Sequence, residues 1–156
     1  MSGNASFVIT LSNNITEKEG IKHLVANNKG FFEVDKNSKK KILSLLQLDS
    51  KYSRAFDLIH IPNLYNVKFD QNSIEAHLDD IILVELKTTK KYLPQNPKGF
   101  FFGATENEFN FAEQLGDRFK FCFVSLHKNS VSFSMLSLSE LQGIIKNKRI
   151  QFQINL

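Results

Sequence analysis

Three segments of the chain carry the signal that starts an α-helix, and short apolar runs lie between them. In each segment a Ser or Thr is followed three residues later by a Glu, a pair that satisfies the free backbone amides of a first helical turn. The three pairs are Thr16 with Glu19, Thr105 with Glu108, and Ser137 with Glu140. A further helix is predicted over residues 39–48, after Ser38. Gly30 and Gly116 follow the first two capped segments, where a glycine commonly ends a helix.

Between these helices the sequence predicts short strands, because apolar runs are bounded by polar or turn-forming residues. The predicted strands cover residues 55–61, 81–87, 99–104, 119–126, 131–135 and 150–154, and residues 67–69 and 73–77 could form a hairpin. This order of elements is typical of an α/β fold with a central mixed sheet flanked by helices. With 156 residues, no internal repeat and no long linker, we expect a single domain over residues 1–156.

The composition is that of a globular protein in a reducing compartment. The 15 Phe residues, with no Trp, indicate a core packed mainly by Phe rings. The single cysteine, Cys122, excludes an intramolecular disulfide, and its place in the apolar run 121–124 predicts a buried hydrophobe rather than a nucleophile. No apolar run approaches about 18 residues and no leader-like segment is present, so we expect a cytoplasmic protein with no membrane partner.

Basic residues outnumber acidic ones, 20 against 16, and the formal charge of +4 is compatible with a polyanionic partner such as DNA. The basic residues gather at 39–41, 87–91 and 146–149. The sequence has no Cys/His cluster for zinc and no phosphate-binding glycine-rich loop. These two absences disfavour a zinc-dependent nuclease of the HNH type and an NTPase motor.

The segment 79–87 departs from the pattern of a buried strand. Its apolar residues run to Val84, and then two opposite charges, Glu85 and Lys87, follow two positions apart. Alternate residues of a strand point to the same face, about 6–7 Å apart, so these two side chains share one face while Val84 and Leu86 pack on the other. Charged groups on a core strand are costly unless they are paired or bind something.

A second acid, Asp57, lies inside the apolar run 55–61. If the two strands are neighbours, Asp57 and Glu85 can converge on one divalent cation, and hard oxygen ligands suit Mg²⁺, with Mn²⁺ as a substitute. Lys87 would then lie beside the metal-bound water and assist hydrolysis of a phosphodiester. The alternatives for the first ligand are Asp70, Asp79 and Asp80.

The pattern resembles the PD-(D/E)xK, or restriction-endonuclease-like, superfamily. The resemblance rests on Asp57, on Glu85-Leu86-Lys87 at the end of an apolar strand, and on the strand, the helix opening at Thr105 and the strand that follow. It covers roughly residues 54–127, and Phe56 stands where the family has a nominal Pro. The later stretch is similar to the nuclease-like domain at the C-terminus of the NO VEIN protein and of some restriction enzymes.

The resemblance implies a restriction-endonuclease-like fold in which Asp57 and Glu85 bind the metal, the carbonyl of Leu86 adds a ligand, and Lys87 assists the attacking water. The next four residues carry hydroxyls and amines that could contact phosphates flanking the scissile one: Thr88, Thr89, Lys90 and Lys91. We therefore expect a Mg²⁺-dependent DNA endonuclease, for instance a small type II restriction enzyme acting as a homodimer.

Other functions stay open. The chain could be a structure-directed repair or junction nuclease, or a non-catalytic nucleic-acid-binding or assembly module on the same fold. An unrelated α/β protein could use Glu85 and Lys87 as a plain salt bridge. Glu19 and Glu108 are explained as helix caps, with a second role near the site left open. Gln114 is expected to face solvent. His60 and His77 are expected to be structural residues within strands.

Overall fold

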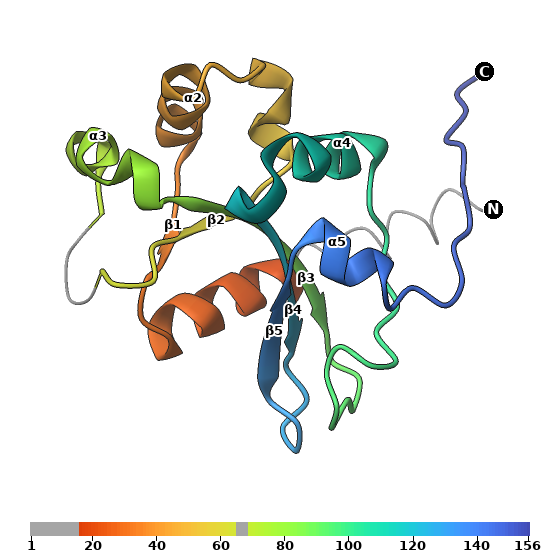
Figure 1. Ribbon diagram of the computed structural model, residues 1–156. Helices are drawn as coiled ribbons and strands as arrows, with labels where there is room; N and C mark the ends of the chain where they lie inside the picture. Colours follow the sequence, from red (N-terminus) through yellow and green to blue (C-terminus); the bar gives the residue numbers. More distant parts are fainter. Residues whose placement is uncertain (1–15, 65–68) are drawn as a thin grey trace.

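The computed structural model describes residues 16–64 and 69–156, and it is built around a five-stranded mixed sheet with helices on both faces (Figure 1). The strands lie in chain order across the sheet: β1 (Phe31–Glu33), β2 (Leu58–His60), β3 (Ile82–Thr89), β4 (Phe119–Ser125) and β5 (Ser132–Leu136). The pair β3 and β4 is parallel, and the other three pairs are antiparallel. The predicted α/β class, with a central mixed sheet flanked by helices, is confirmed.

The helices of the described residues are short. A first helix covers residues 16–27, and it is followed by α2 (Lys36–Leu45), α3 (Ile74–His77), α4 (Glu106–Leu115) and α5 (Leu138–Gln142). Single 3-10 turns cover Ser50–Arg54, Gln71–Ser73, Leu78–Asp80 and Gly116–Arg118. In the part of the chain that the structure describes, no helix is both long and apolar enough to cross a membrane.

Two of the predicted capping boxes form as expected. The Thr105 hydroxyl accepts the Glu108 amide at 3.1 Å, while Glu108 Oε2 accepts the Thr105 amide at 3.1 Å, so α4 begins here. The box of α5 is built in the same way. The predicted start of α2 was wrong, because Asp35 accepts the Ser38 amide at 2.7 Å and starts the helix three residues before residue 39.

Several predicted strands are absent. The hairpin was wrong in its second arm, because Asp70 accepts the Asn72 and Ser73 amides and starts a helical turn that leads into α3, where His77 lies. Residues 65–68, which include most of the first arm, lie outside the described residues. Residues 99–104 and 150–154 join no ladder, the first because its Phe rings pack on the sheet face instead of its backbone pairing at an edge. Of the strand predicted at 55–61, the structure forms the part Leu58–His60 as β2.

The sheet has a different apolar core on each face. On one face α2, α4 and α5 pack over large Phe side chains that are fully buried: Phe56, Phe111, Phe119, Phe121 and Phe123. On the other face the helix at 16–27 contributes Leu24 to a smaller core with Val84, Leu86 and Cys122. Burial raises the pKa of the Cys122 thiol to about 12, which agrees with its predicted role as a small hydrophobe. The expected Phe-packed core is confirmed.

The first helix lies against the end of β3 because Gly20 has no side chain. A Cβ built at Gly20 would overlap Thr88 Cγ2 and lie 3.3 Å from Leu86 Cδ2. Any larger residue would therefore lift the helix off the strand that carries Glu85 and Lys87. The close contact at Gly20 therefore fixes the position of this helix against β3.

Replacing Gly20 by Ala should destabilise the protein by about 1 kcal/mol, although Ala is the better helix former. Overpacking costs about 1–3 kcal/mol and outweighs the gain of about 1 kcal/mol in helix propensity. Urea unfolding measures the change, and adding Thr88→Ser, which removes the overlapping methyl group, should restore most of the loss relative to Thr88→Ser alone. Gly103→Ala is the control, because its Cβ would meet no atom within 4 Å. A stabilised Gly20→Ala protein would show that the helix is not held this closely.

Candidate active site

Asp57 lies where β2 begins, one residue before the ladder with β3. The last pair of that ladder joins Leu58 to Val84. The Asp57 amide donates to the Val84 carbonyl at 2.8 Å, and Asp57 Oδ2 accepts the Leu86 amide at 2.8 Å. The Asp57 carboxylate thus accepts a hydrogen bond from the β3 backbone that a strand carbonyl would otherwise accept. It lies beside Glu85, and its charge raises the pKa of Glu85.

Strand β3 separates its charged and apolar side chains as the alternation predicts. Val84 and Leu86 are buried in the core under the first helix, while Glu85 and Lys87 project from the opposite face. The N–H and C=O groups of one strand residue point to the same side of the strand. Since the Leu86 amide reaches Asp57, the Leu86 carbonyl also points toward the Asp57 side.

Lys87 connects the strand to helix α4. Its Nζ lies 3.1 Å from Glu85 Oε1 and 3.0 Å from Glu108 Oε2. Glu108 therefore has two roles, because the same Oε2 also accepts the Thr105 amide that caps the helix. Capping alone does not account for this residue, and the second role left open for it is the ion pair with Lys87.

Glu85 is almost fully buried, with 6% of its surface exposed, and its Oε2 has no hydrogen-bond partner among the described residues. Burial and the nearby charge of Asp57 raise the pKa of Glu85 to about 10, although Lys87 acts against the shift. Burial alone would lower the pKa of Lys87, but the charges of Glu85 and Glu108 outweigh it and raise that pKa. The site therefore holds a carboxyl group whose charge is poorly compensated.

Glu17, from the helix described over residues 16–27, also belongs to the site. Burial and the Asp57 carboxylate, to which its side chain is hydrogen-bonded, raise the pKa of Glu17, and the charges of Lys87 and Lys39 oppose this. Sequence reasoning missed this residue and considered Glu19 instead. Glu17 is three residues before Gly20 and so shares the helix face that rests on β3, which is the signal that could have identified it.

Glu19 and the first lysine cluster complete the surroundings. Glu19 is exposed and pairs with Lys90 at 3.2 Å, so it lies outside the site. Lys39 Nζ donates to the Phe56 carbonyl at 2.7 Å and lies 5.2 Å from the centre of the Phe56 ring, next to Asp57. One member of the predicted basic cluster at 39–41 is thus turned toward the acids.

The charges of the site do not balance. Four carboxyl groups, those of Glu17, Asp57, Glu85 and Glu108, gather near two ammonium groups, those of Lys39 and Lys87. Within residues 16–64 and 69–156, no three His, Cys, Asp or Glu side chains form a ready metal cage. Mg²⁺ does not need one, because it is commonly held by one or two carboxylates together with water and substrate phosphate. The unpartnered oxygen of Glu85 and the hard oxygen donors around it fit such an ion.

The alternative first ligands lie elsewhere. Asp79 and Asp80 are in the 3-10 turn that precedes β3. Residue 80 is five positions before Glu85, about 16 Å along an extended chain. Asp70 caps the turn that precedes α3. Of the acids considered from the sequence, the structure brings Asp57 to Glu85 and leaves these three away from it.

The residues after Lys87 divide between the two faces. The Thr88 side chain lies against Gly20, on the face of β3 opposite Lys87, so its phosphate contact stays a prediction. Thr89 Oγ1 accepts the Lys91 amide at 3.2 Å, and Lys90 and Lys91 are exposed. Gln114 is exposed on α4, as expected, and His60 lies in β2, stacked on Phe31.

No protein-family model matches the chain, and no similar protein was found among curated proteins or among solved structures. The fold and the site define an α/β protein with a partly buried carboxylate and lysine cluster at the point where β2 begins beside β3. The function is therefore argued from the geometry of that cluster.

In EDTA, Glu85→Gln should stabilise the protein relative to wild type, and the gain should grow as the pH rises from about 5 toward 10. The folded protein holds the Glu85 proton more tightly than the unfolded chain does. Wild-type stability from this group is fully present below the unfolded pKa and is lost as the pH rises toward the folded pKa, whereas Gln has no proton to lose. Across urea unfolding series at several pH values, the difference should change by more than about 1.4 kcal/mol, the equivalent of one pKa unit.

Glu113→Gln is the matched control for that series, because Glu113 is an exposed carboxylate on α4. It should follow wild type across the whole pH range. If Glu85→Gln also follows wild type, or loses stability at alkaline pH, the folded protein does not raise the pKa of the Glu85 carboxyl.

Proposed function

We propose that the chain is a divalent-metal-dependent nuclease of the PD-(D/E)xK type, which hydrolyses phosphodiester bonds in DNA. The observation that carries the proposal is the position of the Asp57 carboxylate beside the buried Glu85, one oxygen of which has no hydrogen-bond partner among the described residues while the other pairs with Lys87. A carboxylate pair of this kind has an excess of negative charge that a cation would neutralise. The order of the elements supports the proposal, since the Asp57 strand, the Glu-x-Lys strand, the capped helix and the parallel strand β4 follow one another in the chain.

Asp57, Glu85 and the carbonyl of Leu86 would hold the ion, Mg²⁺ or Mn²⁺ in its place. When bound, such an ion polarises a phosphate oxygen and lowers the pKa of a coordinated water. Glu17 is the further acid at this position, and it would complete or orient the ligand set through its hydrogen bond to Asp57.

Lys87 would act on the substrate. Its ammonium group has two carboxylate partners, and engagement of Glu85 by a cation leaves Lys87 held by Glu108 alone. Held in this way, Lys87 donates hydrogen bonds to the attacking water or to a phosphate oxygen and stabilises the negative charge that develops there. Glu108 is a positioning residue, because it fixes Lys87 at the start of α4.

The basic balance of the chain favours a polyanionic substrate. The formal charge is +4, and Lys90 and Lys91 follow the proposed catalytic strand on exposed positions. Such lysines contact phosphates without reading the sequence. If the enzyme cuts both strands of a duplex with one site per chain, it would act as a homodimer, as two-fold restriction enzymes do.

A second possible role of the site is favoured by the two ion pairs that Lys87 already makes. Lys87, Glu85 and Glu108 could form a structural ion triad that joins β3 to α4 and has no chemistry. This reading accounts for neither the unpartnered Glu85 oxygen nor the carboxyl pair of Glu17 and Asp57. Mutation of the site separates the two readings.

Asp57→Asn, Glu85→Gln and Lys87→Gln should each lower the rate of DNA cleavage in Mg²⁺ at least about 100-fold, because each removes a ligand or a stabilising donor. Gel assays with plasmid and with linear DNA measure the rate, and EDTA should abolish cleavage by wild type. Glu113→Gln, the exposed acid on α4, is the control and should cleave like wild type. Circular dichroism checks that the variants are folded.

The structural triad gives the opposite pattern. If the triad is only structural, wild type does not cleave DNA with Mg²⁺. Lys87→Gln then unfolds or loses stability, and there is no cleavage activity for it to lose. A folded Asp57→Asn protein that cleaves at the wild-type rate would remove Asp57 from the catalytic set.

A further inference from the structure

An exposed phenylalanine lies on the segment that joins the two halves of the proposed site. Residues 90–105 connect β3, which carries Lys87, to α4, which carries Glu108. Phe100 and Phe102 pack on the Phe123 ring, with centroids 5.0 and 4.9 Å away. Phe101, between them, is turned outward and is 90% exposed. Its two neighbours therefore anchor the backbone and hold the Phe101 ring in solvent.

This ring stands on the same face of the sheet as Lys87. In the parallel ladder Lys87 is paired with Phe123, so the two side chains project from neighbouring strands to one face. Strands lie about 4.8 Å apart within the sheet and a packed layer lies about 10 Å above it, so the backbone of the Phe101 segment lies on the order of 11 Å from β3 at Lys87. Figure 1 shows the segment running from the end of β3 up to α4 along the right-hand side of the molecule.

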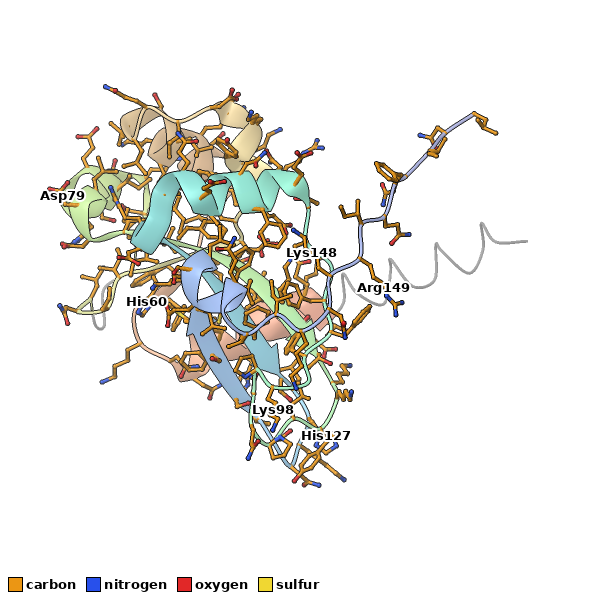
Figure 2. All side chains as sticks on the ribbon, turned by 45° about the vertical axis from the view of Figure 1, so that its right-hand side comes forward. His60, Asp79, Lys98, His127, Lys148 and Arg149 are labelled. Carbon is orange, nitrogen blue, oxygen red and sulfur yellow. The ribbon has the colours of Figure 1, made fainter. Side chains whose placement is uncertain are left out.

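The segment that carries Phe101 is rich in lysine. Residues 86–105 contain four lysines, of which Lys87 pairs with Glu85 and Glu108 and Lys90 pairs with Glu19, while Lys91 and Lys98 are exposed. Residues 118–139 contain no acid. Tyr92, which is 54% exposed, packs its ring against His127 at 5.3 Å and so joins this segment to the turn between β4 and β5. Figure 2 shows Lys98 and His127 together at this end of the molecule, with Lys148 nearer α4. The Lys148 ammonium lies 5.3 Å from the centre of the Phe109 ring, on the α4 side of the same face.

Unpaired nucleotides fit this combination better than the other ligand classes do. An aromatic ring stacks on the face of a base, and lysines follow the phosphates, which is how single strands are bound without sequence preference. In a continuous duplex the base faces are covered by their neighbours. A protein partner would need a broad apolar patch, but Phe100 and Phe102 on either side of Phe101 are turned inward.

We propose that Phe101, with the lysines around it, holds an unpaired nucleotide beside the cleavage site. The substrate would then be a nucleic acid with single-stranded nucleotides next to the scissile phosphate, rather than a fully paired duplex. This inference rests on the proposed function and selects a substrate class for the same site.

Binding in EDTA tests the inference apart from cleavage. The probes are a fluorescein-labelled DNA single strand of mixed sequence and a blunt duplex of the same sequence, read by anisotropy. Wild type should bind the single strand more tightly, and Phe101→Ala should weaken that binding about tenfold, within the range of one lost base stack, without changing duplex binding. Phe101→Tyr keeps a stacking ring and should retain the affinity. Phe152→Ala is the matched control, because Phe152 is an 81% exposed ring on the C-terminal segment, outside residues 90–105.

The outcomes separate the inference from the proposed function. Equal single-strand binding by Phe101→Ala and wild type, or an equal loss on both probes, overturns the inference even if the protein cleaves DNA in Mg²⁺. The same holds if wild type does not bind the single strand at all. Binding through Phe101 in EDTA without any cleavage in Mg²⁺ overturns the nuclease proposal and leaves the nucleotide surface in place. Since Phe101 is exposed, its variants should unfold at the wild-type temperature, which excludes misfolding as the cause of a loss.

Discussion

The ammonium group of Lys87, held between Glu85 and Glu108, is the interaction on which the arrangement of this protein depends. It joins the central strand β3 to the start of α4, on the face of the sheet that carries the larger apolar core. Buried charges persist where partners compensate them. The capping box of α4 and the ion pair share one oxygen, so the start of that helix and the position of Lys87 are fixed together.

The same interaction leaves the site short of positive charge. Lys87 reaches one oxygen of Glu85, and the other oxygen is buried without a partner. Asp57 lies beside Glu85 because its carboxylate accepts a hydrogen bond from the Leu86 amide of β3. Glu17 approaches because Gly20 lets the first helix lie close to that strand. Each acid is brought in by a different local cause, and together they form the cluster at which we propose that a divalent cation binds.

Much of the fold and the centre of the site could be predicted from the sequence, because their causes are local. The alternation around Glu85 predicts which side chains share a face, and the Thr105 and Ser137 boxes predict where α4 and α5 begin. The errors come from competing interactions that a periodic pattern does not contain. Asp35 starts α2 three residues earlier than predicted, and Asp70 caps a helical turn in the segment where a hairpin was predicted. The rings of Phe100 and Phe102 pack on the sheet face instead of their backbone joining a ladder. Glu17 escaped notice because its place in the site depends on a tertiary contact.

The most direct test of the central claim is anomalous diffraction at the manganese edge from crystals grown with Mn²⁺. We predict an ion bound by the Asp57 carboxylate and by Glu85 Oε2 at about 2.1 Å, a distance typical of hard oxygen ligands to a small divalent cation. In that structure Lys87 should keep Glu108 and lose Glu85. Full Mn²⁺ occupancy elsewhere, for instance at Asp79 and Asp80, or no bound ion while Glu85 stays on Lys87, would contradict the account.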